Sequence, residues 1–106
     1  MVDMPPLEDI TRRIVERFNP RRIVLFGSRA RGKAHEFSDV DLFIEMETDL
    51  PPVERDIRVD EIFGLRSWPM DIVVFTPAEV AGERKLTGSL VSVVESEGKV
   101  LYERPE

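Results

Sequence analysis

The chain has 106 residues, and its 15 basic and 21 acidic residues give a formal net charge of −6. A chain of this length buries only about 65% of the surface that it exposes when unfolded, which predicts a single domain over residues 1–106 and excludes a second folded core. The acidic balance argues against proteins that bind nucleic acid or anionic membranes through a basic surface. We therefore expect no direct nucleic-acid binding and no membrane contact.

The sequence contains no cysteine, so it excludes disulfides, thiolate metal ligands and thiol nucleophiles. It has no apolar run near the roughly 18 residues of a membrane-spanning helix. Residues 1–6 lack the basic and apolar regions of a signal peptide. The expected location is therefore cytoplasmic.

The first half of the chain predicts one helix and two strands. Apolar residues recur at helical spacing over Leu7–Phe18, and Asn19-Pro20 ends this amphipathic pattern. The continuous apolar run Ile23–Phe26 ends at Gly27 and is typical of a central strand that is buried on both faces. Residues 39–45 alternate in polarity, which predicts a strand with one core face and one face that begins acidic.

The second half predicts further helices and strands. Residues 51–64 begin with two prolines and end with glycine, as a helix does, and residues 70–75 form an apolar third strand. A capping-box spacing begins at Thr76, from which one last helix is expected to extend to Gly98, followed by a closing strand over residues 99–102. This order predicts an α/β or α+β fold, in which a small mixed β-sheet of about four strands packs against helices.

Three aspartates stand at the starts of predicted strands. Asp39 and Asp41 are two residues apart on one strand, so their side chains point the same way, with Cα atoms about 6.5 Å apart. Asp71 interrupts a later apolar strand and would join the pair if the two strands were neighbours. Such carboxylates repel one another unless a cation lies between them, and oxygen ligands without His or Cys favour Mg²⁺ or Mn²⁺. The alternative is structural, with Asp39 at a strand end, Asp41 facing solvent and Asp71 in a turn.

A phosphate-binding turn is predicted directly after the first strand. Gly27 allows a sharp turn that exposes successive backbone N–H groups, and Ser28 adds a hydroxyl donor. Arg29 and Arg31 carry guanidinium groups that suit phosphate oxygens. The alternative is a plain turn followed by a solvated basic loop. Because paired acids follow this basic loop, the sequence favours a metal-bound polyphosphate, with the loop on the phosphates and the acids on the metal.

The segment Gly27–Ala34 also fits the G-x-x-x-x-G-K pattern of a P-loop. However, Ala34 stands where a P-loop needs a Ser or Thr hydroxyl for Mg²⁺. Only residues 34–38 separate Lys33 from the next predicted strand, which leaves no room for the helix that a P-loop presents to phosphate. We therefore reject the P-loop interpretation.

Together these motifs resemble the polymerase-beta-like nucleotidyltransferase superfamily. The resemblance rests on Gly27-Ser28, an interval of ten residues, Asp39-Val40-Asp41-Leu42 and the later Asp71. The runs Phe26–Gly32 and Ser38–Leu42 look most like its minimal nucleotidyltransferase branch, and the flanking elements fit the compact fold of that family.

The resemblance implies a Mg²⁺-dependent transfer of a nucleoside monophosphate, usually AMP from ATP, to an acceptor hydroxyl, with release of pyrophosphate. Carried over by position, Asp39 and Asp41 would bind two metal ions that bridge the triphosphate. Asp71 would help to hold the second metal ion and to deprotonate the acceptor. The residues expected to contact the nucleotide phosphates are Gly27, Ser28, Arg29 and Arg31.

Minimal members of this family commonly pair with a small helical HEPN protein in toxin–antitoxin modules, and some of them modify that toxin with AMP. The resemblance thus implies a HEPN partner, with a homo-oligomer as the alternative. A second hypothesis is an antitoxin that acts by binding its partner and needs no catalysis. A third is a sensor that binds ATP without turnover.

For Trp68 the alternatives are stacking on a base and covering a loop or a partner surface.

Overall fold

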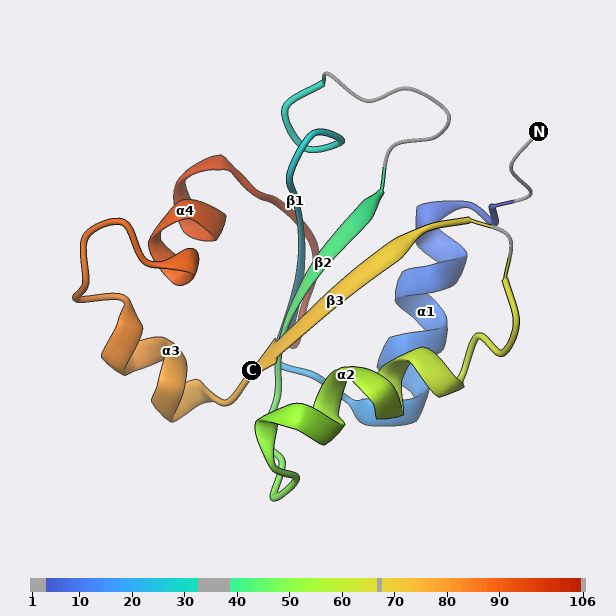
Figure 1. Ribbon diagram of the computed structural model, residues 1–106, viewed down its shortest axis with the longest axis horizontal. Coiled ribbons are helices and arrows are strands. Elements are labelled where there is room, and N and C mark those ends of the chain that lie inside the picture. The colour runs from blue at the N-terminus through green and yellow to red at the C-terminus, as the bar shows by residue number, and fades with distance from the viewer. Residues whose placement is uncertain (1–3, 33–38, 67, 106) are drawn as a thin grey trace.

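The computed structural model describes residues 4–32, 39–66 and 68–105, which form a four-stranded sheet flanked by helices (Figure 1). Along the chain the elements are α1 (Leu7–Phe18), β1 (Arg22–Phe26), β2 (Val40–Glu45), α2 (Pro52–Glu61), β3 (Met70–Phe75), α3 (Pro77–Glu83), α4 (Leu90–Glu97) and β4 (Lys99–Glu103). The predicted mixed sheet is therefore confirmed. Within the described ranges, no helix combines enough length with enough apolar character to cross a bilayer.

The sheet has the strand order β3-β2-β1-β4. β1 is antiparallel to both of its neighbours, whereas β2 is parallel to β3. A parallel pair needs a crossover, and α2 supplies it by returning the chain to the end of the sheet where β2 begins. β1 is an interior strand whose residues Ile23, Val24 and Leu25 are at most 2% exposed, so the predicted central strand is confirmed.

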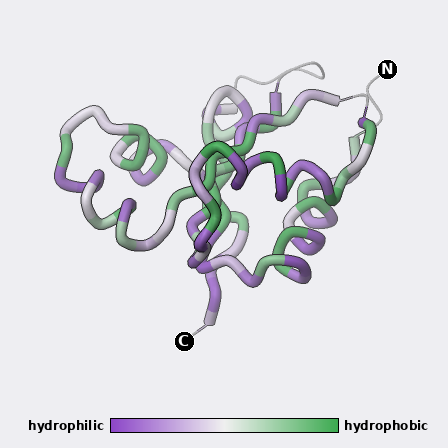
Figure 2. Tube along the Cα trace, turned by 60° about the horizontal axis from the view of Figure 1, so that its bottom comes forward, coloured by the Kyte–Doolittle hydropathy of each residue, from purple (hydrophilic) through white to green (hydrophobic). Residues whose placement is uncertain are grey.

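Helices cover both faces of this sheet. α1 and α2 lie on one side, and α3 and α4 lie on the other (Figure 1). Ile14 and Leu42 belong to the core on the first side, while Phe43, Val80 and Val91 form the core on the second. Figure 2 shows the hydrophobic stretches of the chain gathered at the centre, where the strands lie. Burial on both faces accounts for the continuous apolar runs in the inner strands.

The prediction of one last helix is wrong, because residues 76–98 contain two helices. The predicted capping box of Thr76 and Glu79 is present and begins α3. A turn with Gly88 at φ 81° then interrupts the helical path. Ser89 caps α4 as a new helix, since its hydroxyl accepts the backbone N–H of the third residue after it. This bend lets both short helices reach the same face of the sheet.

The residues that α2 buries are not the ones that its apolar residues would suggest. Val53 and Ile57 are 77% and 56% exposed, whereas Arg55 and Val59 are buried. The Arg55 guanidinium donates to the carbonyl of Val74 on β3, at 3.3 Å. α2 packs against an edge strand, so a long polar side chain on its inner face can satisfy a backbone group that no neighbouring strand reaches.

Trp68 is a core residue. It is 6% exposed, and its ring packs edge-on against Phe63 with centroids 6.0 Å apart. Arg66 donates to its backbone carbonyl at 3.1 Å, which fixes the loop before β3. Because its ring is buried, the base-stacking alternative is wrong and Trp68 instead anchors this loop.

Candidate metal and nucleotide site

The three aspartates predicted from the sequence meet at one end of the sheet. Asp39 directly precedes β2, Asp41 is the second residue of β2, and Asp71 is the second residue of β3. One carboxylate oxygen from each lies within 4.8 Å of the other two. The expectation that Asp71 joins the pair is therefore confirmed, and the purely structural alternative does not explain why all three converge.

The parallel register of β2 and β3 produces this convergence. Asp41 is paired with Asp71, and adjacent strands lie about 4.8 Å apart. Residues two apart on a strand point to the same face. Asp41 therefore shares a face with Phe43 on β2, and Asp71 shares that face with Val73 on β3. Both of those residues belong to the core beneath α3 and α4. The carboxylates thus continue this face of the sheet beyond the point where the helices cover it.

The electrostatics of the cluster favour a cation. Burial raises the pKa of Asp41 above its ordinary value, and the charges of Asp71 and Asp39 raise it further, while Arg29 and Arg31 act in the opposite direction. A divalent cation would relieve the remaining repulsion, and three carboxylate oxygens are ligands of the kind that Mg²⁺ and Mn²⁺ prefer. The residues present therefore fit the metal that the sequence predicts.

Gly27 makes room for the Asp41 carboxylate. Its φ of 77° lies in the left-handed region, as the predicted sharp turn requires. A Cβ atom at this position would overlap with Oδ2 of Asp41. The backbone N–H of Arg31 donates to the Gly27 carbonyl at 3.2 Å, so the chain turns back immediately after β1. Ser28 follows in this turn and is half-buried.

The two arginines of the turn lie within electrostatic reach of the cluster. Both Arg29 and Arg31 lower the pKa of Asp41, which places their positive charges near the carboxylates. Arg31 is exposed and also lies 3.9 Å from Glu97 on α4, a distance at which the pairing is weak. The remainder of the basic loop, including Lys33 and His35, lies outside the described residues.

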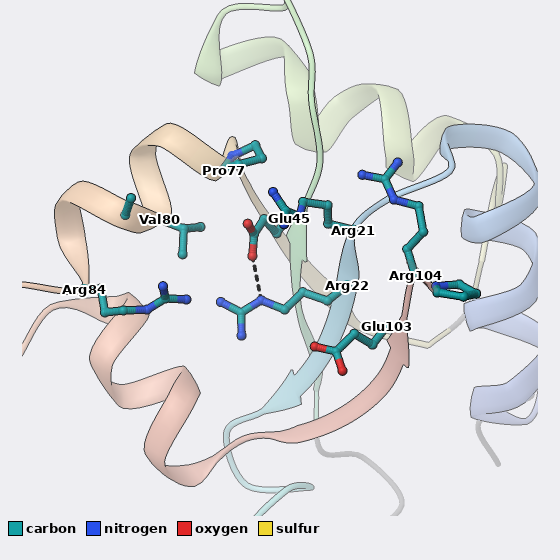
Figure 3. Close-up of a pocket in the computed structure, with 10 residues that line it drawn as sticks. Arg21, Arg22, Glu45, Pro77, Val80, Arg84, Glu103 and Arg104 are labelled. Atoms are coloured by element: carbon teal, nitrogen blue, oxygen red, sulfur yellow. Dashed lines mark hydrogen bonds and ion pairs between the residues drawn. The ribbon is translucent and has the colours of Figure 1, made fainter.

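A pocket of about 940 Å³ lies at the opposite end of the sheet (Figure 3). Several of its charged side chains are held in ion pairs: Nε of Arg22 donates to Glu45 at 2.6 Å, and Arg22 and Arg84 both donate to Glu95 on α4, at 2.8 and 2.6 Å. Four arginines and two glutamates line the pocket, so its lining is positively charged, but none of the three aspartates lines it. Despite its size, this pocket is a weaker candidate for the nucleotide site than the open carboxylate cluster.

A smaller groove of about 150 Å³ opens directly beside Asp71. It lies between α2 and the free edge of β3 and is lined by Asp56, Ile57, Asp60, Arg66, Met70, Asp71 and Ile72. Sequence analysis missed this groove. No motif could have revealed it, because the lining depends on how α2 packs against β3.

Known proteins resemble the chain in sequence and in fold. A 55-residue match is 42% identical to the protein adenylyltransferase MntA of Thermococcus cleftensis, and it covers 48% of this chain and 54% of that relative. The match thus spans about half the length of each protein.

Two solved structures share the fold at 21% sequence identity, and each covers 92% of this chain. A Sulfolobus solfataricus protein assigned as a nucleotidyltransferase superimposes with a TM-score of 0.64 over 78% of its own length. A toxin–antitoxin structure with AMP-PNP gives a TM-score of 0.58 over 73% of its chain.

The family model of the nucleotidyltransferase domain matches residues 7–101. This range contains the glycine turn, the three aspartates and every strand except the last two residues of β4. The resemblance identified from the motifs is confirmed, and the chain belongs to the nucleotidyltransferase domain family.

Proposed function

We propose that this chain transfers AMP from ATP to a hydroxyl group on a protein partner, with Mg²⁺ or Mn²⁺ as the metal. The observation that carries the proposal is the meeting of Asp39, Asp41 and Asp71 within 4.8 Å beside a glycine turn. The adenylyl group and the protein acceptor are suggested by the name of the Thermococcus cleftensis relative.

The proposed reaction forms one bond and breaks one. The acceptor oxygen bonds to the α-phosphorus of ATP, the bond from that phosphorus to the oxygen bridging to the β-phosphorus breaks, and pyrophosphate leaves with the electron pair. Asp39, Asp41 and Asp71 would hold the metal, and Asp71 would also accept the proton of the acceptor hydroxyl. When bound, the metal neutralises phosphate charge and lowers the pKa of the attacking hydroxyl.

The glycine turn has a separate role in this proposal. Gly27 permits the close approach of backbone to the Asp41 side chain, and its neighbour Ser28 would bind phosphate oxygens through its N–H and hydroxyl groups. Arg29 and Arg31 would bind the triphosphate through their guanidinium groups. Their positive charges would offset the repulsion between the triphosphate and the three carboxylates. Fixed charges of this kind stabilise the transition state without reorganisation.

The partner is proposed to be a small helical HEPN protein, with a second copy of the chain as the alternative. The toxin–antitoxin structure of similar fold supports a protein partner. The carboxylate cluster is also open, with Asp39 and Asp71 exposed, which leaves room for a partner to bring the acceptor.

The test is transfer of label from [α-³²P]ATP in the presence of Mg²⁺, with the co-purified or genetically adjacent partner as acceptor. The wild-type chain should label the partner and release pyrophosphate, and the double variant Asp39→Asn, Asp41→Asn should do neither. Asp49→Asn serves as the matched control, since Asp49 is an exposed carboxylate in the loop after β2.

Equal labelling by the double variant would overturn the catalytic role. If the double variant still neutralised the partner in cells, binding alone would suffice and the antitoxin hypothesis without catalysis would replace ours. Mg²⁺-dependent ATP binding with no pyrophosphate release in the presence of the partner would instead favour the sensor.

A further inference from the structure

The free edge of β3 has a defined pattern of backbone groups. The carbonyl of Pro69, just before β3, accepts the N–H of Val40, and the carbonyl of Phe75 accepts the N–H of Met46, just after β2. The backbone groups of the odd-numbered residues of β3 therefore face β2. The backbone N–H and C=O groups of Met70, Ile72 and Val74 therefore point away from the sheet, toward the groove and α2. β3 is the last strand on this side, and such groups can pair with an added strand.

Two arginine side chains occupy both ends of this edge. Arg66 donates to the Met70 carbonyl at 3.0 Å, and Arg55 donates to the Val74 carbonyl at 3.3 Å. Both guanidinium groups are held in place, because Arg66 also pairs with Asp60, and Arg55 pairs with Glu79. The edge is therefore closed at these two positions against pairing with another strand.

Ile72, between them, is left open. In the part of the chain that the structure describes, neither its N–H nor its C=O has a hydrogen-bond partner on the outer side. It lines the groove together with Asp71, the neighbouring residue and a member of the carboxylate cluster. The N–H and C=O groups of Ile72 are thus available to pair with another strand, directly beside the carboxylate cluster of the proposed site.

We infer that the acceptor is an extended polypeptide segment that pairs with Ile72 at the β3 edge and carries a cationic residue directly beside its hydroxyl residue. The inference rests on the proposed transfer and adds how the acceptor is chosen. Side chains of paired residues on adjacent strands point to the same face, about 5 Å apart. A residue opposite Ile72 therefore points toward α2, and its neighbour opposite Asp71 points toward the carboxylates.

The charge of the groove specifies the cation. Asp56 lines the groove on the exposed side of α2 and makes no ion pair within the described ranges. Among the described residues, Arg66 is the one basic residue that lines the groove, and it is already paired with Asp60. A Lys or Arg side chain opposite Ile72 would meet the unpaired Asp56 carboxylate, and its alkyl stem would lie on Ile57.

Binding of short synthetic peptides tests the inference independently of catalysis. One series places Lys next to Tyr or Ser, in both orders; a second places Lys two residues from the hydroxyl residue; a third replaces Lys with Glu. In ¹⁵N-correlated NMR spectra with Mg²⁺ and AMP-PNP, the adjacent series should shift the Ile72 amide downfield more than any other β3 amide. The other two series should bind at least about fivefold more weakly, because they place the charge on the wrong face or with the wrong sign.

Two variants, each with its own control, sharpen this test. Asp56→Lys should weaken the adjacent series by about tenfold and improve the Glu series, whereas Glu54→Lys, the same change on an exposed residue of α2 outside the groove, should alter neither by more than about twofold. Ile72→Pro removes the outward N–H, which the β2 ladder does not use, together with the isoleucine side chain, and should weaken every series. Ile72→Val keeps the N–H and should retain binding, which controls for the change in packing.

The outcomes separate the two proposals. Equal effects of Asp56→Lys and Glu54→Lys, shifts confined to other residues, or no binding by the adjacent series would overturn the edge-pairing inference even if the intact partner is labelled. An Ile72 shift that grows with protein concentration in the absence of peptide would make a second copy the occupant and would also overturn it. Binding with the expected dependence but without pyrophosphate release would leave the edge pairing in place and defeat the transfer.

Discussion

The two ends of the sheet shift the pKa values of carboxyl groups in opposite directions. At one end Asp41 lies among other acids, and burial together with Asp71 and Asp39 raises its pKa. At the other end, hydrogen bonds from Arg84 are the main reason that the pKa of Glu95 falls to about 2, with Arg22 adding to the effect. The Glu95 charge is balanced by two arginines of the chain, whereas the charge of the aspartate cluster is left unbalanced where a metal and a nucleotide are proposed to complete the site.

The largest effect is expected from removing one carboxylate of the aspartate cluster. We expect Asp41→Asn to slow AMP transfer by about 10³-fold, or about 4 kcal/mol, because a metal ligand is lost. The metal-free protein should become more stable, since a carboxyl group with a raised pKa destabilises the fold at neutral pH. Pyrophosphate release and urea unfolding in EDTA measure the two effects, and a loss of metal-free stability would contradict the account.

At the opposite end, a single substitution should act on stability alone. Arg22→Met leaves the buried Glu45 carboxylate without its partner at 2.6 Å and should lower the free energy of unfolding by about 3 kcal/mol. Mg²⁺ binding by the folded protein should be unchanged, because the pair lies at the end of the sheet remote from the aspartates. The double variant Arg22→Met, Glu45→Gln should recover part of the stability in urea unfolding, and failure to recover any would show that the charge is not the cause.

Two glycines of the same turn provide a matched pair. Gly27 and Gly32 both have positive φ, 77° and 73°, but only Gly27 lies against the Asp41 carboxylate, and a Cβ on Gly32 would meet nothing within 4 Å. Each Ala substitution should cost about 1–2 kcal/mol of stability through backbone strain. Gly27→Ala should in addition weaken Mg²⁺ binding by about tenfold, as measured by calorimetry. Equal Mg²⁺ affinity in the two variants would mean that Asp41 can move aside without loss.

The smallest effect is a dependence of stability on pH. Because the pKa of Glu95 is lowered from 4.5 to about 2, its contribution is present above pH 4.5 and is lost as the pH falls toward 2. Glu95→Gln should destabilise the protein by about 1 kcal/mol at pH 7, a value reduced for the partial exposure of the side chain. Urea unfolding at several pH values should show the difference between variant and wild type shrinking below pH 4.5 and vanishing near pH 2. Glu16→Gln, in an exposed pair with Arg12, is the control and should change stability by only a few tenths of a kcal/mol.

The site was more predictable than some of the elements around it. Asp39 and Asp41 share a strand, so their side chains share a face from local geometry alone. By contrast, the apolar spacing across residues 76–98 indicated one helix, and the structure has two. Gly88 and Ser89 decide the break, and a helix-like pattern of apolar residues cannot reveal a bend that serves packing on a distant strand.

The sequence by itself determined the strands, the glycine turn and the family, because these depend on local periodicity and on short motifs. Only the tertiary structure decided that β2 and β3 are parallel neighbours, so that Asp71 meets Asp41, and that Ile72 is the open position on the β3 edge. The physical reason is that strand order and register depend on how the faces of the sheet and of the helices are buried together. The free energy of this burial comes from residues that are far apart in the chain.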